Sequence, residues 1–280
     1  MSAAPQLFRL AGVMGWPVGH SRSPRLHGYW LARYGIRGAY VPMPVKPENL
    51  EQALRALPVL GFAGCNLTVP LKERALGMLD EVEPEARRIG SVNTVIVRAD
   101  GSLFGRSTDG FGFIENLRDR APRWRPGNAP VAILGAGGSA RAVAAALHRA
   151  GETEIRIINR TLDRAATLVA DLGGPLQACG WSERQDAIRG CHLLVNTTTQ
   201  GMVGEPPLDL TPAGLADGAI VTDIVYVPLE TPLLAAARAV GYHPVDGLGM
   251  LLHQARPGFE AWFGVAPEVD AGLREAVLAS

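Results

Sequence analysis

Cysteine is scarce in this sequence, and its spacing has no pattern. The three cysteines, Cys65, Cys179 and Cys191, are dispersed along 280 residues. An odd number of widely spaced cysteines predicts reduced thiols packed inside a cytosolic protein and excludes a disulfide framework. No spacing of cysteine and histidine is typical of a zinc site, so we expect no bound metal.

Net charge is also lacking. The 27 lysines and arginines balance 27 aspartates and glutamates, and there is no basic stripe, so a nucleic-acid partner is not expected. Long hydrophobic runs are missing as well. Residues 10–18 are interrupted by Gly12, Gly15 and Pro17, and residues 142–147 are too few to span a bilayer. We therefore expect a cytoplasmic protein without a membrane partner. Its apolar surface is compatible with a homodimer, which no segment requires.

The chain is long enough for two domains of ordinary size, and 47% hydrophobic residues suffice for substantial cores. In the first hundred residues, apolar runs alternate with helical patterns, which predicts a layer of strands and helices. The expected strands are 8–14, 39–45, 64–69 and 92–98, and the expected helices are 24–34 and 47–57. Ser23 would be the N-cap and Pro24 the first residue of the earlier helix.

The most informative motif follows an apolar strand at 131–134. It reads Gly135-Ala136-Gly137-Gly138-Ser139-Ala140 and leads into an alanine-rich helical pattern, with a second strand at 155–158. Gly135 permits a tight turn, Gly137 lets a pyrophosphate approach the backbone, and Ala140 lets helix and strand pack closely. The phosphates would lie at the N-terminus of the helix. This order predicts a Rossmann-type dinucleotide-binding domain.

The end of the second strand indicates which nucleotide binds. NAD-binding domains usually have Asp or Glu there to hold the ribose 2′-hydroxyl. Here the sequence is Asn159-Arg160-Thr161-Leu162-Asp163-Arg164, with no acid at the strand end. Guanidinium groups bind a phosphate through paired hydrogen bonds, whereas an acid would repel it. Asp163 lies further on and fits the start of a helix. NADP(H) is therefore the expected cofactor.

Residues 119–130 are rich in Pro, Arg and Gly and separate the first layer from the dinucleotide motif. Further strands are expected at 193–195 and 219–222, and a strongly helical pattern runs from Gly247 to about Phe263. We predict an α/β protein of two domains. An N-terminal α/β substrate-binding and catalytic domain would comprise residues 1–112 and 248–280, and a Rossmann NADP-binding domain residues 113–247. The C-terminal helices would return to the first domain.

Polar residues interrupt the apolar patterns of the first domain. Ser21 and Ser23 stand beside a helix N-terminus, which suits a carboxylate ligand, although Ser23 fits a plain N-cap equally well. Asn66 and Thr68 alternate with apolar neighbours along a strand end and so face the same side. These residues are candidates for binding a polar ligand.

Lys72 is a candidate for a different reason. Pro70 suits a first helical position, which would put Lys72 in the first turn, where a cation opposes the helix dipole. A residue that breaks a local rule is a candidate for function, and a solvated surface lysine is the alternative. Asn93 precedes an apolar strand. Asp109 stands where a helix would start, so it is either a functional carboxylate or an N-cap.

Taken in order, these residues and the dinucleotide motif resemble the shikimate dehydrogenase family over nearly the whole chain. The matching motifs are Gly15-x-Pro17-x-x-His20-Ser21-x-Ser23-Pro24-x-x-His27, Asn66-x-Thr68-x-Pro70-x-Lys72, Asn93-Thr94, Thr108-Asp109-Gly110, Gly135-Ala136-Gly137-Gly138, Asn159-Arg160-Thr161-x-x-Arg164, Asn196-Thr197-Thr198-x-x-Gly201-Met202, Asp223-Ile224-Val225-Tyr226-x-Pro228-x-x-Thr231-Pro232-Leu233-Leu234, and Gly247-x-x-Met250-Leu251-Leu252-x-Gln254. The family more often has Asn at the positions of Gly28 and Ser107, and a small apolar residue at that of His253. Gly28 would then affect only helix packing.

The resemblance implies an oxidoreductase that reduces 3-dehydroshikimate reversibly to shikimate with NADPH, in the biosynthesis of chorismate and aromatic amino acids. Lys72 and Asp109 would be the catalytic acid–base pair. The residues implied for substrate binding are Ser21, Ser23, Asn66, Thr68, Lys72, Asn93, Asp109, Tyr226 and Gln254. Those implied for NADP(H) binding are Gly135, Ala136, Gly137, Gly138, Ser139, Asn159, Arg160, Thr161, Arg164, Ile224 and Gly247.

Two other functions fit the same scaffold. A quinate/shikimate dehydrogenase of catabolism often uses NAD, which Arg160 and Arg164 disfavour. A non-catalytic NADP-binding sensor would be expected to have lost Lys72 or Asp109, and this chain retains both.

Overall fold

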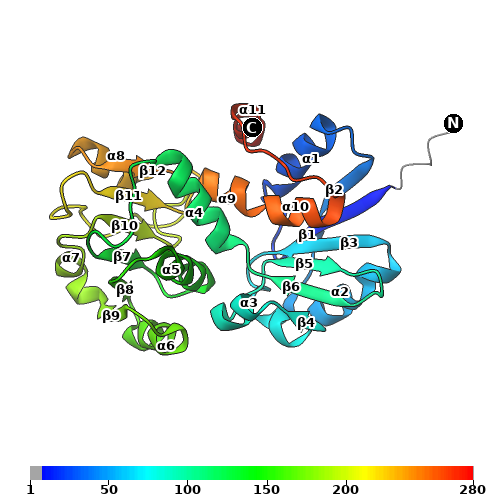
Figure 1. Ribbon diagram of the computed structural model, residues 1–280, viewed down its shortest axis with the longest axis horizontal. Coiled ribbons are helices and arrows are strands. Elements are labelled where there is room, and N and C mark those ends of the chain that lie inside the picture. Colours follow the sequence, from blue (N-terminus) through cyan, green and yellow to red (C-terminus); the bar gives the residue numbers. More distant parts are fainter. Residues whose placement is uncertain (1–7, 280) are drawn as a thin grey trace. The chain divides into compact units, whose positions relative to one another are not determined.

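The computed structural model describes residues 8–279, so residues 1–7 and 280 of the predicted first domain lie outside the described part. The chain forms two compact units. The first comprises Met1–Thr108 and Gln254–Ser280, and the second comprises Asp109–His253. Within each unit, helices pack against a sheet (Figure 1). The predicted α/β class is confirmed.

The first unit contains a mixed six-stranded sheet in the order β2-β1-β3-β5-β6-β4. Strands β1, β2 and β3 are parallel, whereas β5 runs antiparallel to both β3 and β6. Its elements are β1 (Arg9–Gly15), α1 (Ser23–Arg33), β2 (Gly38–Pro44), η1 (Pro47–Asn49), α2 (Leu50–Val59), β3 (Phe62–Leu67), η2 (Arg74–Gly77), β4 (Glu81–Val82), α3 (Pro84–Ile89), β5 (Thr94–Val97), β6 (Leu103–Arg106), α10 (Arg256–Phe263) and α11 (Ala271–Leu278), where η marks a 3-10 helix. The strands and helices predicted in this region are confirmed, with ends shifted by a few residues.

One buried apolar cluster packs helix α2 against this sheet. It joins Leu50, Leu54 and Leu57 of α2 to Cys65 and Leu67 of β3. The helix is amphipathic because its leucines recur three and four residues apart, which puts them on one face. Cys65 is completely buried, and burial raises the pKa of its thiol. It is a packed thiol, as the sequence predicts.

The start of α1 differs from the prediction. Ser23 is the first helical residue, and Arg22 occupies the N-cap position. The side chain that meets the helix start belongs to Ser21, whose Oγ accepts a hydrogen bond from the Ser23 amide at 3.3 Å. Arg22 already has helical backbone angles, with φ −83° and ψ −6°, so the helix begins earlier than the Ser-Pro pair predicts. The prediction of Ser23 as N-cap is therefore wrong.

The segment around Lys72 is a turn, so the predicted helix at Pro70 is also wrong. The Leu71 amide donates to the Thr68 carbonyl at 2.9 Å, which closes the turn. The Lys72 carbonyl accepts from the Val92 amide at 3.0 Å and is not used in a helical ladder. The next helical residues are those of η2. Lys72 therefore does not oppose a helix dipole, and the prediction that it does is wrong.

The C-terminal helices return to the first unit, as predicted. Helix α10 lies against β1, β3 and β5, and the Trp262 indole donates to the Val95 carbonyl at 3.0 Å. This close approach needs Gly64, where a Cβ would lie 2.1 Å from the Val95 oxygen and 2.3 Å from Trp262 Nε1.

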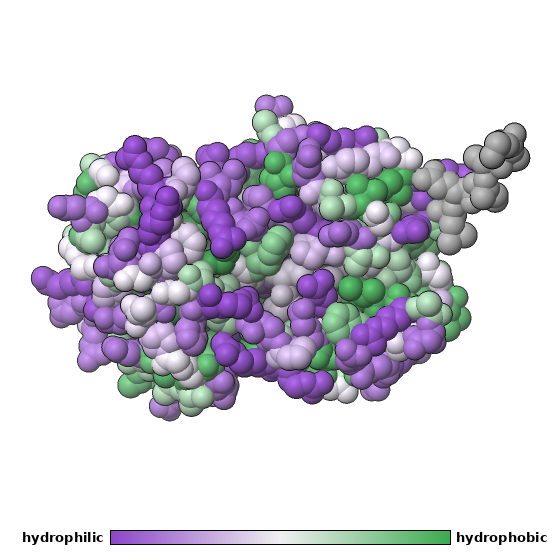
Figure 2. Space-filling view, viewed as in Figure 1, coloured by the Kyte–Doolittle hydropathy of each residue, from purple (hydrophilic) through white to green (hydrophobic). Residues whose placement is uncertain are grey.

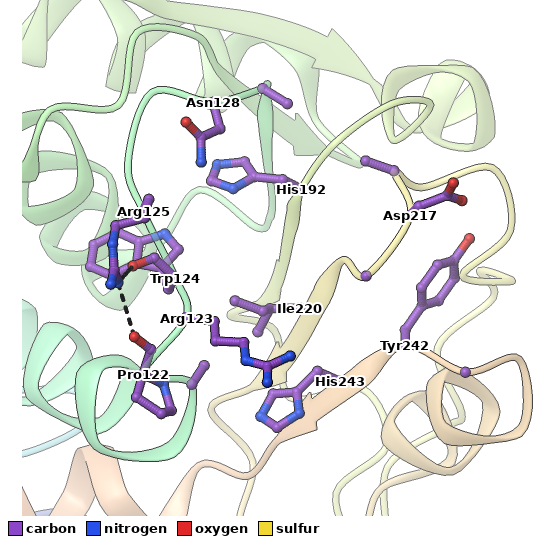
Figure 3. Close-up of a pocket in the computed structure, with 15 residues that line it drawn as sticks. Pro122, Arg123, Trp124, Arg125, Asn128, His192, Asp217, Ile220, Tyr242 and His243 are labelled. Atoms are coloured by element: carbon purple, nitrogen blue, oxygen red, sulfur yellow. Dashed lines mark hydrogen bonds between the residues drawn. The ribbon is translucent and has the colours of Figure 1, made fainter.

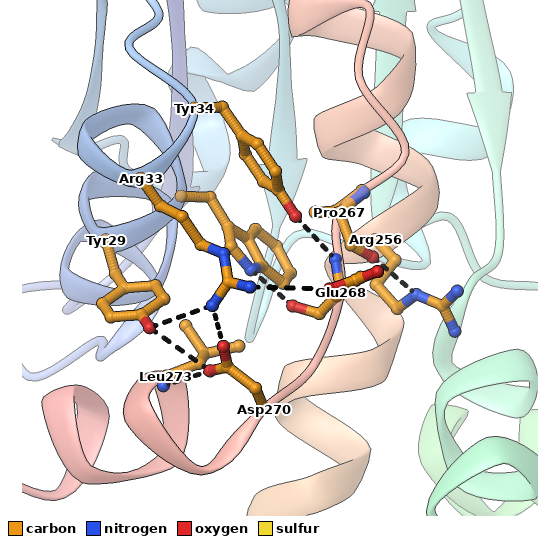
Figure 4. Close-up of polar contacts among 9 residues, drawn as sticks. Tyr29, Arg33, Tyr34, Arg256, Pro267, Glu268, Asp270 and Leu273 are labelled. Carbon is orange, nitrogen blue, oxygen red and sulfur yellow. Dashed lines mark hydrogen bonds and ion pairs between the residues drawn. The ribbon is translucent and has the colours of Figure 1, made fainter.

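Polar contacts hold the segment that leads into α11 against α1 (Figure 4). Arg33 pairs with Asp270, and Trp30 Nε1 donates to the Glu268 carbonyl at 2.9 Å. The Glu268 amide donates to the Tyr34 hydroxyl at 3.0 Å. The predicted continuous helical pattern from Gly247 to Phe263 is two helices, α9 (Leu248–Gln254) and α10, with a break at Ala255.

The second unit contains a six-stranded sheet in which every neighbouring pair is parallel, in the order β12-β11-β10-β7-β8-β9. Its elements are α4 (Asp109–Arg120), β7 (Val131–Leu134), α5 (Gly138–Ala150), β8 (Ile155–Asn159), α6 (Leu162–Leu172), β9 (Leu176–Gly180), η3 (Trp181–Glu183), α7 (Arg184–Ala187), β10 (Leu193–Asn196), β11 (Ile220–Asp223), α8 (Pro232–Ala239), β12 (His243–Val245) and most of α9. This is the strand order of dinucleotide-binding Rossmann domains, whose topological switch point lies between β7 and β10. The predicted Rossmann fold is confirmed.

Candidate active site

Predicted site residues of the first unit gather where β1 and β3 end and β5 begins. Asn66 and Thr94 are paired across the antiparallel β3–β5 ladder. Because β5 runs opposite to β3, its first residues lie beside the last residues of β3. Topology therefore brings Asn93 next to Asn66, although the two are far apart in the sequence.

A buried hydrogen-bond network joins three predicted substrate residues. Asn66 Nδ2 donates to the Asn93 carbonyl at 3.0 Å and to Thr94 Oγ1 at 3.2 Å. Asn93 Oδ1 accepts from the Thr108 amide at 2.8 Å, and Asn93 Nδ2 donates to Gln254 Oε1 at 3.1 Å. Asn66, Asn93 and Gln254 are all buried. The network ties the start of the returning C-terminal segment to the sheet.

Thr68 lies on the loop that follows β3, Ser21 lies on the loop that follows β1, and Ser23 is the first residue of α1. The Thr68 amide donates to the Met14 carbonyl at 2.9 Å, and a Cβ on Gly15 would lie 2.4 Å from Thr68 Cγ2. Glycine at position 15 therefore allows the two loops to pass each other. Ser21 is partly exposed, whereas Ser23 is buried.

Lys72 is half-buried. Its carbonyl accepts a hydrogen bond from the Val92 amide, which places the Lys72 backbone beside the residue next to Asn93. The first unit thus contains seven of the predicted substrate or catalytic residues at neighbouring positions of its sheet and loops: Ser21, Ser23, Asn66, Thr68, Lys72, Asn93 and Gln254.

In the second unit, the glycine motif follows β7 at the switch point of the sheet. Gly135 has φ +108°, and a Cβ there would lie 2.7 Å from Thr197 Oγ1. Thr197, which follows β10, donates through its hydroxyl to the Leu134 carbonyl at 2.6 Å. A Cβ on Gly137 would meet no atom within 4 Å. Gly135 is required by the fold, whereas the backbone at Gly137 is open to a ligand.

Helix α5 begins at Gly138, so Ala136 and Gly137 precede it and Ser139 is in its first turn. Ala140 is completely buried, as close packing of helix and strand requires. The first amides of α5 have no partner within the helix, which makes its N-terminus a favourable place for an anion.

The residues that follow β8 are exposed. The side chains of Arg160 and Arg164 make no hydrogen bond or ion pair within residues 8–279. Asn159 Nδ2 donates to the Thr161 carbonyl at 2.8 Å and shapes this turn. Asp163 lies in the first turn of α6, as predicted. Two guanidinium groups without protein partners at this position fit a phosphate ligand.

Asp223 organises the loop after β11, a function that the sequence analysis missed. It is completely buried, and its carboxylate accepts from Asn196 Nδ2 at 3.0 Å, the Val225 amide at 3.0 Å and the Thr231 hydroxyl at 2.8 Å. Burial raises its pKa to about 6. Thr231 also caps α8 through the Leu234 amide. The spacing of Asp223 and Thr231 in the family motif was the available signal.

Gly247 allows a second close approach. A Cβ there would lie 2.4 Å from the Ile224 carbonyl, so only glycine lets the segment after β12 pass the loop after β11. Tyr226 follows on that loop and is partly buried.

Asp109 is the first residue of α4 and is buried. Asp109, Tyr226 and the predicted nucleotide residues all belong to the second unit.

A cavity of about 730 Å³ lies at the opposite end of the second sheet, where β7, β10, β11 and β12 begin (Figure 3). Several of its polar groups already have partners within the unit. His243 contacts the Arg120 carbonyl at 2.8 Å, Arg125 donates to the Trp124 carbonyl at 2.7 Å, and His192 contacts Glu152 at 3.2 Å. Dinucleotides bind at the other end of such sheets, outside the carboxyl ends of the strands. This cavity is separate from the predicted nucleotide site.

Residues 8–279 contain no helix long and apolar enough to cross a membrane. Within the same range, no group of three or more His, Cys, Asp or Glu side chains is arranged to hold a metal ion. Hydrophilic residues cover much of the surface seen in Figure 2.

Comparison with known proteins agrees with this geometry. Residues 13–95 match the family model described as the shikimate dehydrogenase substrate binding domain. Residues 123–203 match shikimate / quinate 5-dehydrogenase, and residues 247–277 match the shikimate 5′-dehydrogenase C-terminal domain. The shikimate dehydrogenase (NADP(+)) of Rhodospirillum rubrum is 62% identical over 96% of this chain and 97% of its own.

The chain belongs to the shikimate dehydrogenase family.

Solved structures of the family are similar in fold. Shikimate 5-dehydrogenase from Thermus thermophilus, crystallised with NADP(H) and shikimate, is 38% identical with a TM-score of 0.86, over 96% of this chain and 98% of that one. Quinate dehydrogenase from Corynebacterium glutamicum, in complex with NAD, is 32% identical with a TM-score of 0.88, over the same shares. The fold is therefore shared by relatives with different substrates and cofactors, and the choice between them depends on individual residues.

The departures from the family pattern have different surroundings. Gly28 is exposed, and a Cβ there would meet nothing within 4 Å. It has no packing partner, so the expected effect on helix packing is wrong. Ser107 is partly buried immediately before Thr108, whose amide is held by Asn93. His253 is buried next to Gln254.

Proposed function

We propose that this protein catalyses the reversible, NADPH-dependent reduction of 3-dehydroshikimate to shikimate, within the biosynthesis of chorismate and aromatic amino acids. The observation that carries the proposal is the buried network of Asn66, Asn93 and Gln254. It combines amide groups from three distant segments at one end of the first sheet. Amides arranged in this way suit a ring that carries several hydroxyls. The free, mostly buried cysteines and the absence of charge excess agree with a cytoplasmic location.

The first unit would be the substrate-binding domain and the second the NADP-binding domain. In the second, Gly135 to Ser139 would hold the pyrophosphate, and Ile224 and Gly247 would lie near the nicotinamide. Asn159, Arg160, Thr161 and Arg164 would bind the adenosine 2′-phosphate. The open backbone at Gly137 fits this cofactor, as do the two guanidinium groups, which have no partner within residues 8–279. When bound, NADPH supplies the hydride.

In the first unit, Ser21 and Ser23 would hold the substrate carboxylate, and the family resemblance implies the same role for Tyr226. Their hydroxyls are neutral donors, and the start of α1 contributes a favourable dipole. Asn66, Thr68, Asn93, Asp109 and Gln254 would bind the ring hydroxyls. Desolvated amides that are already oriented need no reorganisation when the substrate binds.

Lys72 and Asp109 would carry the proton chemistry. Reduction of a ketone creates negative charge on its oxygen, which the Lys72 ammonium would stabilise and protonate at that atom. In the oxidative direction, Lys72 would accept the hydroxyl proton. The Asp109 carboxylate would hold the ammonium and the substrate hydroxyl in place.

The decisive test is an assay of the purified protein with shikimate or quinate and with NADP⁺ or NAD⁺, followed through the absorbance of the reduced nicotinamide. We expect oxidation of shikimate with NADP⁺ and little activity with quinate. Arg160→Ala and Arg164→Ala should raise the KM for NADP⁺ without changing that for NAD⁺. A preference for quinate or NAD⁺ would place the protein in catabolism, and NADP⁺ binding without turnover would make it a sensor.

A further inference from the structure

Tyr40 and Asn66 are joined by a buried hydrogen bond in the first unit. Tyr40 lies in β2, two strands away from Asn66 in the sheet. Its hydroxyl is 2.6 Å from Asn66 Oδ1 in a buried environment. The ring of Tyr40 stacks on that of His27, with centroids 3.9 Å apart and planes within 7°. Both rings belong to an aromatic cluster with Trp262.

Chemistry fixes the direction of every hydrogen bond at Asn66. The Asn93 carbonyl accepts only, so the group that faces it at 3.0 Å must be the Asn66 amide nitrogen. The amide's second N–H is directed to Thr94 Oγ1. The oxygen of the carboxamide therefore faces Tyr40, and the Tyr40 hydroxyl must be the donor. The Asn66 carboxamide therefore has one orientation, and exchange of its oxygen and nitrogen would break these hydrogen bonds.

Both partners of this contact keep the required protonation state. Burial raises the pKa of Tyr40 well above 10.0, and the neighbouring Ser23 hydroxyl opposes only part of that rise. Burial also lowers the pKa of His27 to about 3, so the ring stacked on Tyr40 is neutral. The Tyr40 hydroxyl therefore keeps its proton at neutral pH and can donate it to a hydrogen bond.

We propose that Tyr40 is a positioning residue for substrate recognition: its hydroxyl, with Thr94, locks the Asn66 carboxamide so that this residue can bind a ligand only by accepting a hydrogen bond at Oδ1. The inference rests on the proposed function. Both Asn66 N–H groups are committed within the protein, whereas Oδ1 has two lone pairs and Tyr40 uses one. His27 is the other polar neighbour of Asn66, but neither of its ring nitrogens makes a hydrogen bond within residues 8–279. Asn66 therefore selects a hydroxyl and rejects a carbonyl at the position that it contacts.

This restriction identifies which part of the substrate Asn66 binds. The reacting carbon carries a hydroxyl in shikimate and a carbonyl in 3-dehydroshikimate, and a carbonyl cannot donate. Asn66 must therefore bind a hydroxyl that is present in both, away from the reacting carbon. An interaction of this kind is equal in the ground and transition states, so its loss raises KM and leaves kcat nearly unchanged.

The test compares Tyr40→Phe with Tyr34→Phe, which removes a hydroxyl from the same aromatic cluster at a contact with the Glu268 amide. We expect Tyr40→Phe to raise KM about fivefold to tenfold for both shikimate and 3-dehydroshikimate, which is the loss of one oriented hydrogen bond. The kcat and the KM for NADP⁺ should stay within about twofold of the wild type. Thr94→Val, which removes the acceptor on the other side of the same carboxamide, should raise KM in the same way.

Substrate analogues identify the hydroxyl. The KM effect of Tyr40→Phe should disappear with one of two analogues, 4-deoxyshikimate or 5-deoxyshikimate. That analogue is the one that lacks the hydroxyl contacted by Asn66. Equal KM values for Tyr40→Phe and Tyr34→Phe, or a KM effect that persists with both analogues, would overturn the inference. A lower unfolding temperature of Tyr40→Phe with an unchanged KM would reduce Tyr40 to a structural residue.

A measurement without substrate separates this inference from the proposed function. The side-chain amide signals of Asn66 in a ¹⁵N NMR spectrum can be assigned by their loss in Asn66→Ser. Tyr40→Phe should shift or broaden these signals, and Tyr34→Phe should not. Unchanged signals in Tyr40→Phe would contradict the lock, whatever the enzyme's substrate. Failure of the wild type to oxidise shikimate would instead count against the proposed function alone.

Discussion

At the scale of single residues, burial decides what each polar group can do. Asp223 accepts three hydrogen bonds, none of them from a cation, at the completely buried end of β11. Desolvation outweighs these bonds and raises its pKa to about 6. The loop that carries Ile224 and Tyr226 is therefore built around a carboxylate that is costly to ionise.

This raised pKa predicts a pH-dependent stability. The folded carboxyl binds its proton more tightly than the unfolded one, whose pKa is near 3.8. Its contribution to stability is therefore fully present below about pH 4 and is lost as the pH rises through about 6. In Asp223→Asn, which cannot ionise, we expect this component to vanish. Relative to the variant, the wild type should lose up to about 3 kcal/mol of unfolding free energy between pH 4 and 7.

Urea denaturation of both proteins at several pH values measures the difference, because the other titrating groups cancel between them. Asp246→Asn is the matched control, since Asp246 is only partly buried. A difference between wild type and Asp223→Asn that stays constant from pH 4 to 7 would show that the carboxyl has an ordinary pKa in the folded protein.

At the scale of elements, glycines set how closely strands, loops and helices approach. Gly135 has a positive φ and faces Thr197, whereas Gly137 has φ −87° and open space around it. The two glycines of one motif therefore have different physical roles. Sequence reasoning predicted the turn at Gly135 correctly, but only the fold shows that Thr197 is the residue it must clear.

We expect Gly135→Ala and Gly137→Ala to behave differently. Alanine at 135 adopts an unfavourable backbone conformation, at about 1–2 kcal/mol, and collides with Thr197, so it should lower both thermal stability and NADP⁺ affinity. Alanine at 137 should leave stability unchanged and weaken NADP⁺ binding at least tenfold, because its methyl group would occupy the space of the pyrophosphate.

Calorimetric titration with NADP⁺ and thermal unfolding measure the two effects. Gly28→Ala serves as the control, since a Cβ at this exposed helical position meets nothing within 4 Å. Full NADP⁺ affinity in Gly137→Ala would remove this glycine from the cofactor site.

At the scale of the whole molecule, the proposed catalytic pair is divided between two units. Lys72 belongs to the first and Asp109 to the second, and the chain passes from one to the other between Thr108 and Asp109. Lys72 is also one of only two lysines in the sequence, the other being Lys46, whereas arginine supplies the remaining basic residues. Arginine cannot release a proton in this pH range, which suits lysine to an acid–base role.

We expect Lys72→Ala and Asp109→Ala each to lower kcat by about 10²–10⁴-fold, as removal of a positioned acid or base does. Because Lys72 and Asp109 would act together in one proton transfer, the kcat of the double variant should be little lower than that of the more damaged single variant. Steady-state kinetics of the four proteins measures this coupling. Lys46→Ala, at an exposed position, is the matched control and should keep the wild-type kcat. Strictly multiplicative effects would show that Lys72 and Asp109 act independently.

The sequence by itself determined the strand–glycine–helix motif, the order of α/β elements and the arginines after β8. These are local signals: residue type and spacing act on the backbone within a few residues. It failed where a tertiary hydrogen bond competes with a local preference. Pro70 fits a helix start, but the Val92 amide donates a hydrogen bond to the Lys72 carbonyl, and the chain forms a turn there.

Only the tertiary structure decided which distant side chains meet. Tyr40 has no motif around it, yet the parallel pairing of β1 with β2 and β3 carries its hydroxyl to Asn66. Asp223 belongs to a sequence motif, but only its buried position in the fold raises its pKa. Gln254 reaches Asn93 because the last helices return to the first sheet. Sequence spacing cannot encode these contacts, because they depend on strand register and on which groups lose their water when the core closes.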